Sequence, residues 1–198
     1  MLKTKIIASQ ITNLTDARYF AAWGVDFMGF CMDEDSENSI SPSKVKEIKS
    51  WVEGPQFFGE FHTTESKEYI EFMAKEADLD TVLLGHNIDL TSIHSLEYLR
   101  LFQEVNWSEE IIKFDHAEIV VWKTDQMWED MDAKDISFLR TIVQKTDIYL
   151  DFPFQVEHLD DILSKLKPAG LLIRGSAEEK VGYKSYDDLD EFFEALAD

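Results

Sequence analysis

The sequence predicts an α/β fold: a single (β/α)8 TIM barrel with parallel strands, formed by residues 1–198 as one domain. Short apolar runs alternate with segments of helical period along almost the whole chain. The apolar runs are continuous, as expected of strands that are buried on both faces. No linker rich in Pro, Gly or Ser and no low-complexity tract interrupts the alternation. Together these three features favour one compact barrel domain.

Eight strands are expected. In chain order they are Lys5–Ile11, Phe27–Cys31, Gln56–His62, Thr81–Leu84, Tyr98–Val105, Glu118–Lys123, Ile148–Asp151 and Gly170–Arg174. An open doubly wound sheet is the competing architecture. The first strand is not followed by the glycine-rich phosphate loop typical of that fold, which disfavours it. Eight units in 198 residues leave about 25 residues per unit, fewer than in most barrels.

Helix start and stop signals lie between the strand candidates. Thr15 precedes the first helical segment, and Gly24 follows it as a C-cap glycine would. Ser41-Pro42 combines a cap residue with a first-turn proline. Acidic starts that complement the helix dipole are Thr64-Glu65, Asp132-Ala133 and Tyr186-Asp187-Asp188. The fourth and fifth helices, near Leu90–Ser95 and Ser108–Phe114, are expected to be short.

The charge balance disfavours polyanionic partners. Forty Asp and Glu residues against nineteen Lys and Arg residues give a formal net charge of −21. A field of that sign repels nucleic acid and anionic membrane surfaces. We therefore expect no nucleic-acid partner and no membrane partner, and a small-molecule ligand is the class of partner that stays open. We expect either a monomer or a homodimer.

A cytoplasmic protein is expected. The single cysteine, Cys31, cannot form an internal disulfide, which fits a reducing compartment. The first residues lack the apolar stretch and cleavage site of a signal peptide, and no run of about 18 apolar residues occurs in the sequence.

Several motifs resemble those of the phosphoribosylanthranilate isomerase family. The segment Ile11-Thr12-Asn13-Leu14-Thr15-Asp16-Ala17 is similar to the family's I-T-N-x-x-D-A, and Trp23–Phe30 is similar to its A-G-A-D-x-x-G-F. Phe58-Gly59-Glu60-Phe61 keeps the family's spacing, and Ala177–Lys184 is similar to its V-E-x-x-P-G-x-K. The resemblance is strong over about the first sixty residues and moderate over about the last thirty.

The resemblance implies a barrel and an Amadori rearrangement, in which an aminoaldose becomes an aminoketose during tryptophan biosynthesis. That reaction needs a proton donor at the sugar ring oxygen and a base for the adjacent carbon. The family uses a Cys as base and an Asp as acid, both at the carboxyl ends of barrel strands. Glycine-rich backbone after strands seven and eight binds the substrate phosphate.

At the positions that match these family residues, the chain carries others. The general-base Cys corresponds to Ser9, and an unassisted serine is a much poorer base than a thiolate. The general-acid Asp corresponds to Lys123, and the substrate-contacting Arg corresponds to Asn38. The paired glycines after strand seven correspond to Phe152-Pro153, and proline has no N–H to offer a phosphate. These replacements predict a divergent member without the family's isomerase activity, with either a structural or a ligand-binding role.

Candidate site residues lie at the carboxyl ends of the predicted strands. The catalytic candidates are Ser9, Lys123 and Asp151, and the ligand-binding candidates are Asn38 and the run Arg174-Gly175-Ser176. Lys123, Asp151 and Arg174 end neighbouring strands, so they form either a repurposed site or a structural salt-bridge network.

No metal site and no cofactor are assigned. His62, His86 and Asp33 are residue types that bind zinc or iron, but their spacing matches no recognised motif. Two alternatives to an inactive barrel stay open. One is an enzyme that acts on another small molecule at the same barrel mouth, and the other is a genuine isomerase in which Ser9 and Lys123 take over the chemistry.

Overall fold

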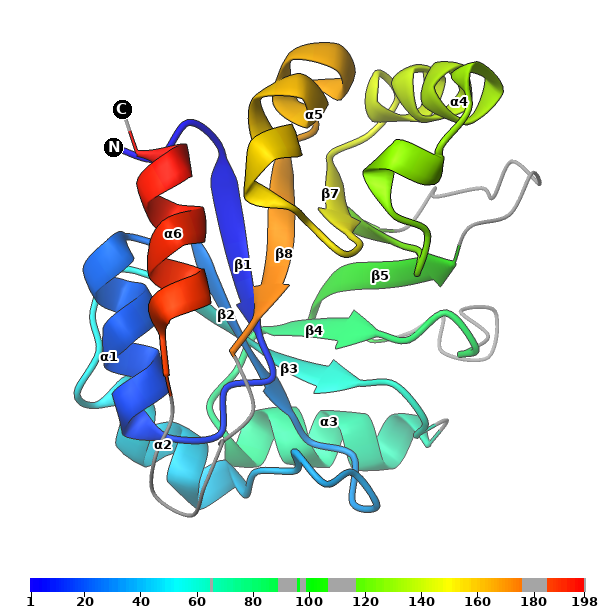
Figure 1. Cartoon of the computed structure of the whole chain (residues 1–198). Coiled ribbons are helices and arrows are strands. Elements are labelled where there is room, and N and C mark those ends of the chain that lie inside the picture. The colour runs from blue at the N-terminus through cyan, green and yellow to red at the C-terminus, as the bar shows by residue number, and fades with distance from the viewer. Residues whose placement is uncertain (65, 89–95, 97–98, 107–116, 176–184, 198) are drawn as a thin grey trace.

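The computed structural model describes residues 1–64, 66–88, 96, 99–106, 117–175 and 185–197. Eight parallel strands close into a barrel in sequence order, which confirms the predicted fold class (Figure 1). The strands are β1 (Lys5–Ser9), β2 (Phe27–Cys31), β3 (Gln56–Phe61), β4 (Thr81–Leu84), β5 (Arg100–Asn106), β6 (Ile119–Lys123), β7 (Ile148–Asp151) and β8 (Gly170–Arg174).

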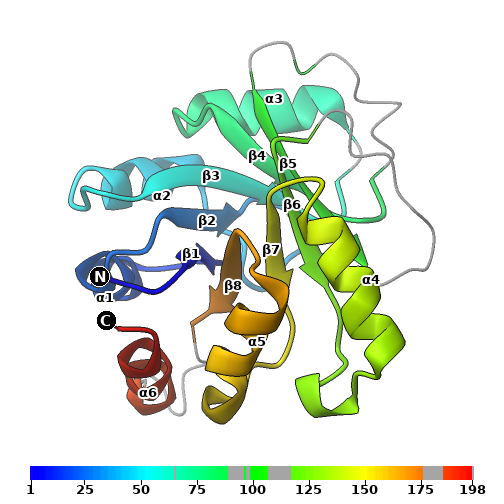
Figure 2. The ribbon, with the colours of Figure 1, turned by 90° about the horizontal axis from the view of Figure 1, so that it is seen from above.

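Helices surround the strands, as Figure 2 shows in the view from above. The α-helices are α1 (Leu14–Trp23), α2 (Pro42–Lys49), α3 (Lys67–Glu76), α4 (Ala133–Val143), α5 (Leu159–Leu166) and α6 (Asp187–Leu196). Short 3-10 helices, η1 (Trp128–Asp130) and η2 (Val156–His158), precede α4 and α5. The expected short helices near 90–95 and 108–114 lie outside the described residues. None of the described helices is long and apolar enough to span a membrane.

Most of the predicted helix signals act as expected. The Ser41 side chain accepts a hydrogen bond from the Lys44 N–H at the start of α2, and Asp132 forms a capping box with Asp135 at the start of α4. Gly24 ends α1 in the left-handed conformation, with φ of 77°. Two starts differ from expectation. Asn13 caps α1 in place of Thr15, and Ser66 caps α3 two residues after Thr64.

The strand bounds differ from expectation by one or two residues. The first strand ends at Ser9, before the expected Ile11, because Gln10 has a φ of 57° and cannot continue an extended ladder. The third strand ends at Phe61 and the sixth begins at Ile119, each one residue inside the expected bound. The fifth strand is shifted to Arg100–Asn106.

The barrel interior is filled by layers of side chains that alternate strands contribute. The strand registers place four inward-facing residues at each level. From the amino-terminal end, the first three layers are Phe27, Thr81, Ile119 and Gly170; Ile7, Phe58, Phe102 and Tyr149; and Gly29, Leu83, Val121 and Leu172. All of these side chains but the two glycines are almost fully buried, so the interior is a packed core and not a pore.

Gly29 has a steric role in this packing. A Cβ atom at this position would overlap the Glu60 carboxylate oxygen and come within 2.6 Å of the Phe58 ring. The absence of a side chain in the third layer therefore makes room for a carboxylate in the layer above it.

We predict that Gly29→Ala destabilises the protein by about 1–3 kcal/mol, because overpacking a filled core forces neighbouring side chains out of position. Urea unfolding of the wild type and the variant measures the effect. The same substitution in a Glu60→Ala background should be less destabilising, since one of the overlapping groups is gone. An equal cost in both backgrounds would contradict the proposed contact.

Candidate functional site

A fourth interior layer, at the carboxyl ends of the strands, is polar. It consists of Ser9, Glu60, Glu104 and Asp151, one from each odd-numbered strand. Their exposed fractions are 1%, 0%, 2% and 5%, respectively. Each lies two residues beyond an inward-facing apolar residue of the same strand, so strand alternation points all four into the barrel. We call these four residues the polar layer.

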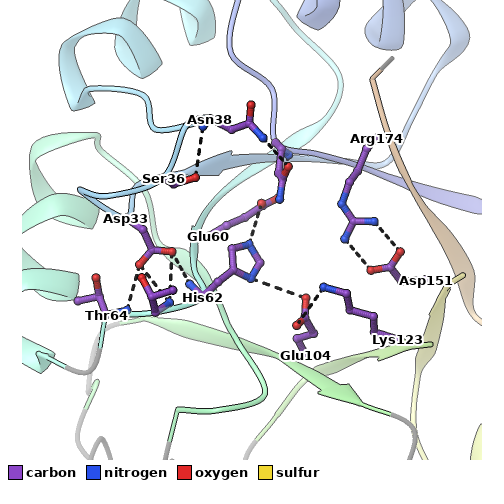
Figure 3. Close-up of polar contacts among 12 residues, drawn as sticks. Asp33, Ser36, Asn38, Glu60, His62, Thr64, Glu104, Lys123, Asp151 and Arg174 are labelled. Carbon is purple, nitrogen blue, oxygen red and sulfur yellow. Dashed lines mark hydrogen bonds and ion pairs between the residues drawn. The ribbon is translucent and has the colours of Figure 1, made fainter. Parts of the chain in front are cut away.

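Asp151 is compensated by Arg174 on the neighbouring strand. The two guanidinium NH groups donate to the two carboxylate oxygens at 2.6 Å each, a bidentate arrangement (Figure 3). Burial alone would lower the pKa of Arg174, but the hydrogen-bonded charge of Asp151 raises it above its ordinary value, and Glu60 and Glu104 add to this effect. Arg174 is therefore held as the counter-ion of a buried acid.

His62 lies between the other two acids of the polar layer. Its Nε2 is 3.3 Å from Glu60 Oε2, and its Nδ1 is 3.7 Å from Glu104 Oε2 (Figure 3). Burial alone would lower the pKa of His62, but the hydrogen bond and charge of Glu60, followed by the charges of Glu104 and Asp33, raise it above 6.5. The imidazolium form donates from both nitrogens, which suits an acid on either side.

Glu104 is shared by three basic side chains. Its Oε1 is 3.1 Å from His86 Nδ1 and 3.7 Å from Lys123 Nζ, and its Oε2 faces His62. Glu104 Oε2 and the Ser9 hydroxyl have no hydrogen-bond partner among the described residues, although both atoms are buried. These two atoms retain hydrogen-bonding capacity at the top of the barrel interior.

Asp33 stabilises a loop and does not face the histidines as a ligand would. Its carboxylate accepts the backbone N–H groups of His62, Thr63 and Thr64 at 2.6–3.4 Å. These hydrogen bonds hold the pKa of Asp33 below its ordinary value, although burial alone would raise it. Within the described parts of the chain, no group of three or more His, Cys, Asp or Glu side chains has a metal-binding arrangement.

Asn38 lies at the rim of the mouth. Its side-chain NH2 donates to Gln10 Oε1 at 2.9 Å, and its backbone N–H donates to the Ser36 hydroxyl at 3.3 Å. Gln10 in turn donates its backbone N–H to Glu60 Oε1 at 3.2 Å. Asn38 is therefore connected to the polar layer through Gln10.

A cavity of about 430 Å³ opens beside the barrel mouth, between the ends of β7 and β8, η2 and the start of α6. We call it the β7–β8 cavity. It lies where barrels of this kind often bind phosphate. Its lining residues are Asp151, Phe152, Phe154, Gln155, Val156, Glu157, Leu172, Ile173, Arg174, Asp188, Leu189, Glu191 and Phe192. Phe152 is 6% exposed and packs on Phe154.

Solved structures with the same architecture cover nearly the whole chain. Phosphoribosylanthranilate isomerase from Thermus thermophilus is 20% identical, with a TM-score of 0.76 over 98% of each chain. The enzyme from Thermotoga maritima is 19% identical, with the same TM-score and coverage. TrpF from Jonesia denitrificans is 14% identical, with a TM-score of 0.80 over 98% of this chain and 96% of that one. The chain has the phosphoribosylanthranilate isomerase fold.

The resemblance found in the sequence is thus confirmed at the level of the fold. No protein-family model matches the chain, and no curated protein sequence matches it. At 14–20% identity, these isomerase structures establish a shared architecture and do not establish a shared reaction.

The structure brings the sequence candidates together in part. Ser9 and Asp151 share the polar layer, and Arg174 binds Asp151. Lys123 lies beside Glu104, with which it forms its ion pair. Gly175 follows β8 at the mouth, and Ser176 lies outside the described residues.

Sequence reasoning missed Glu60 and Glu104 as site residues. The signal was present, because each is the only acid in its strand and lies two residues after an inward-facing phenylalanine. An acid with that parity must point into the barrel.

The raised pKa of His62 predicts a pH dependence of stability. The imidazolium stabilises the fold fully below the unfolded pKa of about 6.5, and this stabilisation is lost as pH rises through the higher folded pKa. We expect the free energy of unfolding to fall across this interval in the wild type and to fall less in His62→Gln. Urea unfolding from pH 5.5 to 9 measures it. His158→Gln is the control, since its partner Glu129 is exposed. An unchanged slope in His62→Gln would refute the assignment.

Removing the counter-ion of Arg174 should be more damaging than breaking a similar pair at the surface. We expect Asp151→Asn to destabilise the protein by about 2–4 kcal/mol, because it leaves a largely enclosed guanidinium uncompensated. Glu118→Gln is the matched control: Glu118 also binds an arginine, Arg100, through both oxygens, but its side chain is 52% exposed. That control should lose less than about 1 kcal/mol. Thermal and urea unfolding compare the two, and equal losses would contradict the expectation.

Proposed function

We propose that this chain is a small-molecule-binding barrel that does not catalyse the phosphoribosylanthranilate rearrangement. The observation that carries the proposal is that Arg174 is already bound by a carboxylate. It is the cation at the β7–β8 cavity, and its guanidinium is bound in a bidentate pair by Asp151. A cation committed in this way is poorly available to a substrate phosphate.

The catalytic position on β1 supports the same proposal. A serine becomes a useful base or nucleophile when a neighbouring base takes its proton. Within the described residues, the Ser9 hydroxyl has no hydrogen-bond partner, so no base is positioned to activate it. At the position of the family's acid, Lys123 is paired with Glu104.

The phosphate position also argues against the ancestral reaction. Phe152 is buried against Phe154, where the family has backbone glycines, and Pro153 offers no N–H. The lining of the β7–β8 cavity includes four carboxylates. Such a lining repels a phosphate. The cavity is nevertheless within the size range of small-molecule sites, about 300–1,000 Å³, which supports ligand binding in some other form.

An enzyme acting on another small molecule is the second candidate. Two buried acids, Glu60 and Glu104, flank the imidazole of His62, with Lys123 beside Glu104. Paired titratable groups at a barrel mouth are typical of proton-transfer sites. Glu104 Oε2 accepts no hydrogen bond from the described residues, although His62 lies 3.7 Å away, so it is the carboxylate oxygen in this cluster with free capacity to accept a proton.

Purified protein incubated with phosphoribosylanthranilate tests the proposal, with the Thermus thermophilus isomerase as positive control. We expect no turnover above the uncatalysed rate, and no growth when the gene is placed in an isomerase-deficient strain on tryptophan-free medium. Turnover that is abolished by Ser9→Ala or Lys123→Ala would overturn the proposal and establish a genuine isomerase.

A further inference from the structure

We propose that the β7–β8 cavity binds an organic cation: an amine with at least one N–H, carried on an apolar or aromatic group. This inference rests on the proposed function and adds to it the chemical class of the ligand. It is carried by three independent features of the cavity wall, which are its charge, its aromatic side chains and an unsatisfied acceptor.

The charge of the wall is strongly negative. Among the described residues, Asp151, Glu157, Asp188 and Glu191 line the cavity against one cation, Arg174. Because Arg174 and Asp151 neutralise each other, the negative charges of Glu157, Asp188 and Glu191 remain unbalanced within the described cavity wall. Nowhere in the described parts of the chain do Glu157, Asp188 or Glu191 have a side-chain hydrogen bond or ion pair. Their uncompensated charge attracts a cation into the cavity and disfavours an anion.

Aromatic side chains supply the second feature. The rings of Phe152 and Phe154 lie 4.5 Å apart between centroids, and those of Phe154 and Phe192 lie 6.0 Å apart. The three rings form one continuous aromatic wall from the β7 end to α6. Aromatic rings bind cations through their negative faces and bind apolar groups by burial. Carboxylates next to such a wall suit a molecule with an ammonium group at one end and an apolar body at the other.

Gln155 supplies the third feature. It lines the cavity, and its side-chain oxygen is buried without a hydrogen-bond partner among the described residues. A buried acceptor without a donor is unfavourable by about 1–3 kcal/mol. This oxygen has almost no accessible surface, so a ligand donor gains this energy by turning the Gln155 side chain toward the cavity. An ammonium N–H is such a donor, whereas a quaternary ammonium has none. The acceptor therefore favours a primary or secondary amine.

Isothermal titration calorimetry with four probes tests the proposal on the full chain. The probes are 2-phenylethylamine, its N,N,N-trimethyl derivative, 3-phenylpropionate and inorganic phosphate. We expect 2-phenylethylamine to bind at least about tenfold more tightly than 3-phenylpropionate, and to weaken as salt is added, because the attraction is electrostatic. The trimethyl derivative should bind more weakly than the primary amine. Preferred binding of either anion, or no binding of the amine, would overturn the proposal.

Matched variants of helix α6 locate the site. Asp188→Asn/Glu191→Gln removes two carboxylates of the cavity wall and should weaken amine binding by about fivefold, the effect expected of two partly exposed ion pairs. Asp187→Asn/Glu194→Gln removes the same charge from the same helix at exposed positions outside the cavity, and should leave binding unchanged. Equal weakening in both variants would mean that the net charge of the protein, and not the cavity wall, determines amine binding. That result would refute a site in this cavity.

The binding experiment and the turnover experiment test the two proposals separately. Turnover of phosphoribosylanthranilate by the same preparation would contradict the proposed function, whichever probe binds. Absence of turnover together with absence of amine binding would contradict this inference alone. Circular dichroism of each variant confirms that a loss of affinity is not a loss of fold.

Discussion

Burying a carboxylate inside a barrel requires a positive partner, and the mouth of this protein is arranged around that requirement. The polar layer contains three acids, and each lies against a basic side chain from a strand or loop nearby. Arg174 forms an ion pair with Asp151, and His62 forms one with Glu60. Glu104 lies within ion-pair distance of His62, His86 and Lys123. The strands, by setting which side chains point inward, fix both the charges and their partners.

This arrangement has a chemical consequence for the mouth. With His62 as imidazolium, Arg174, His62 and Lys123 together balance the three acids of the polar layer. These basic side chains are then committed to internal partners, and the part of the mouth that the structure describes offers little positive charge to a phosphorylated substrate. A barrel mouth balanced in this way differs in kind from one that offers backbone donors to a phosphate, although the two share the same strands and helices.

The sequence was sufficient to predict the strands because continuous apolar runs are their direct signature, and all eight were placed to within two residues. It was less informative where one residue decides a local conformation, as at Gln10, whose positive φ ends β1 early. The partners of the mouth residues were not predictable either. Lys123 and Asp151 are adjacent in register, yet Lys123 pairs with Glu104 on the other side. Side-chain reach and the fourfold layering of the interior decide that choice, and neither is visible in a linear pattern.

Gln10 also retains a conformation that its side chain does not favour. A non-glycine residue with a φ of 57° is strained by about 1–3 kcal/mol. The left-handed bend directs the Gln10 N–H to Glu60, and the side chain of Gln10 accepts from Asn38. These two hydrogen bonds offset the strain at the end of β1. One strained residue thus connects the segment that carries Asn38 to the buried acid of β3, so the order of the mouth depends on a main-chain bend as well as on its charges.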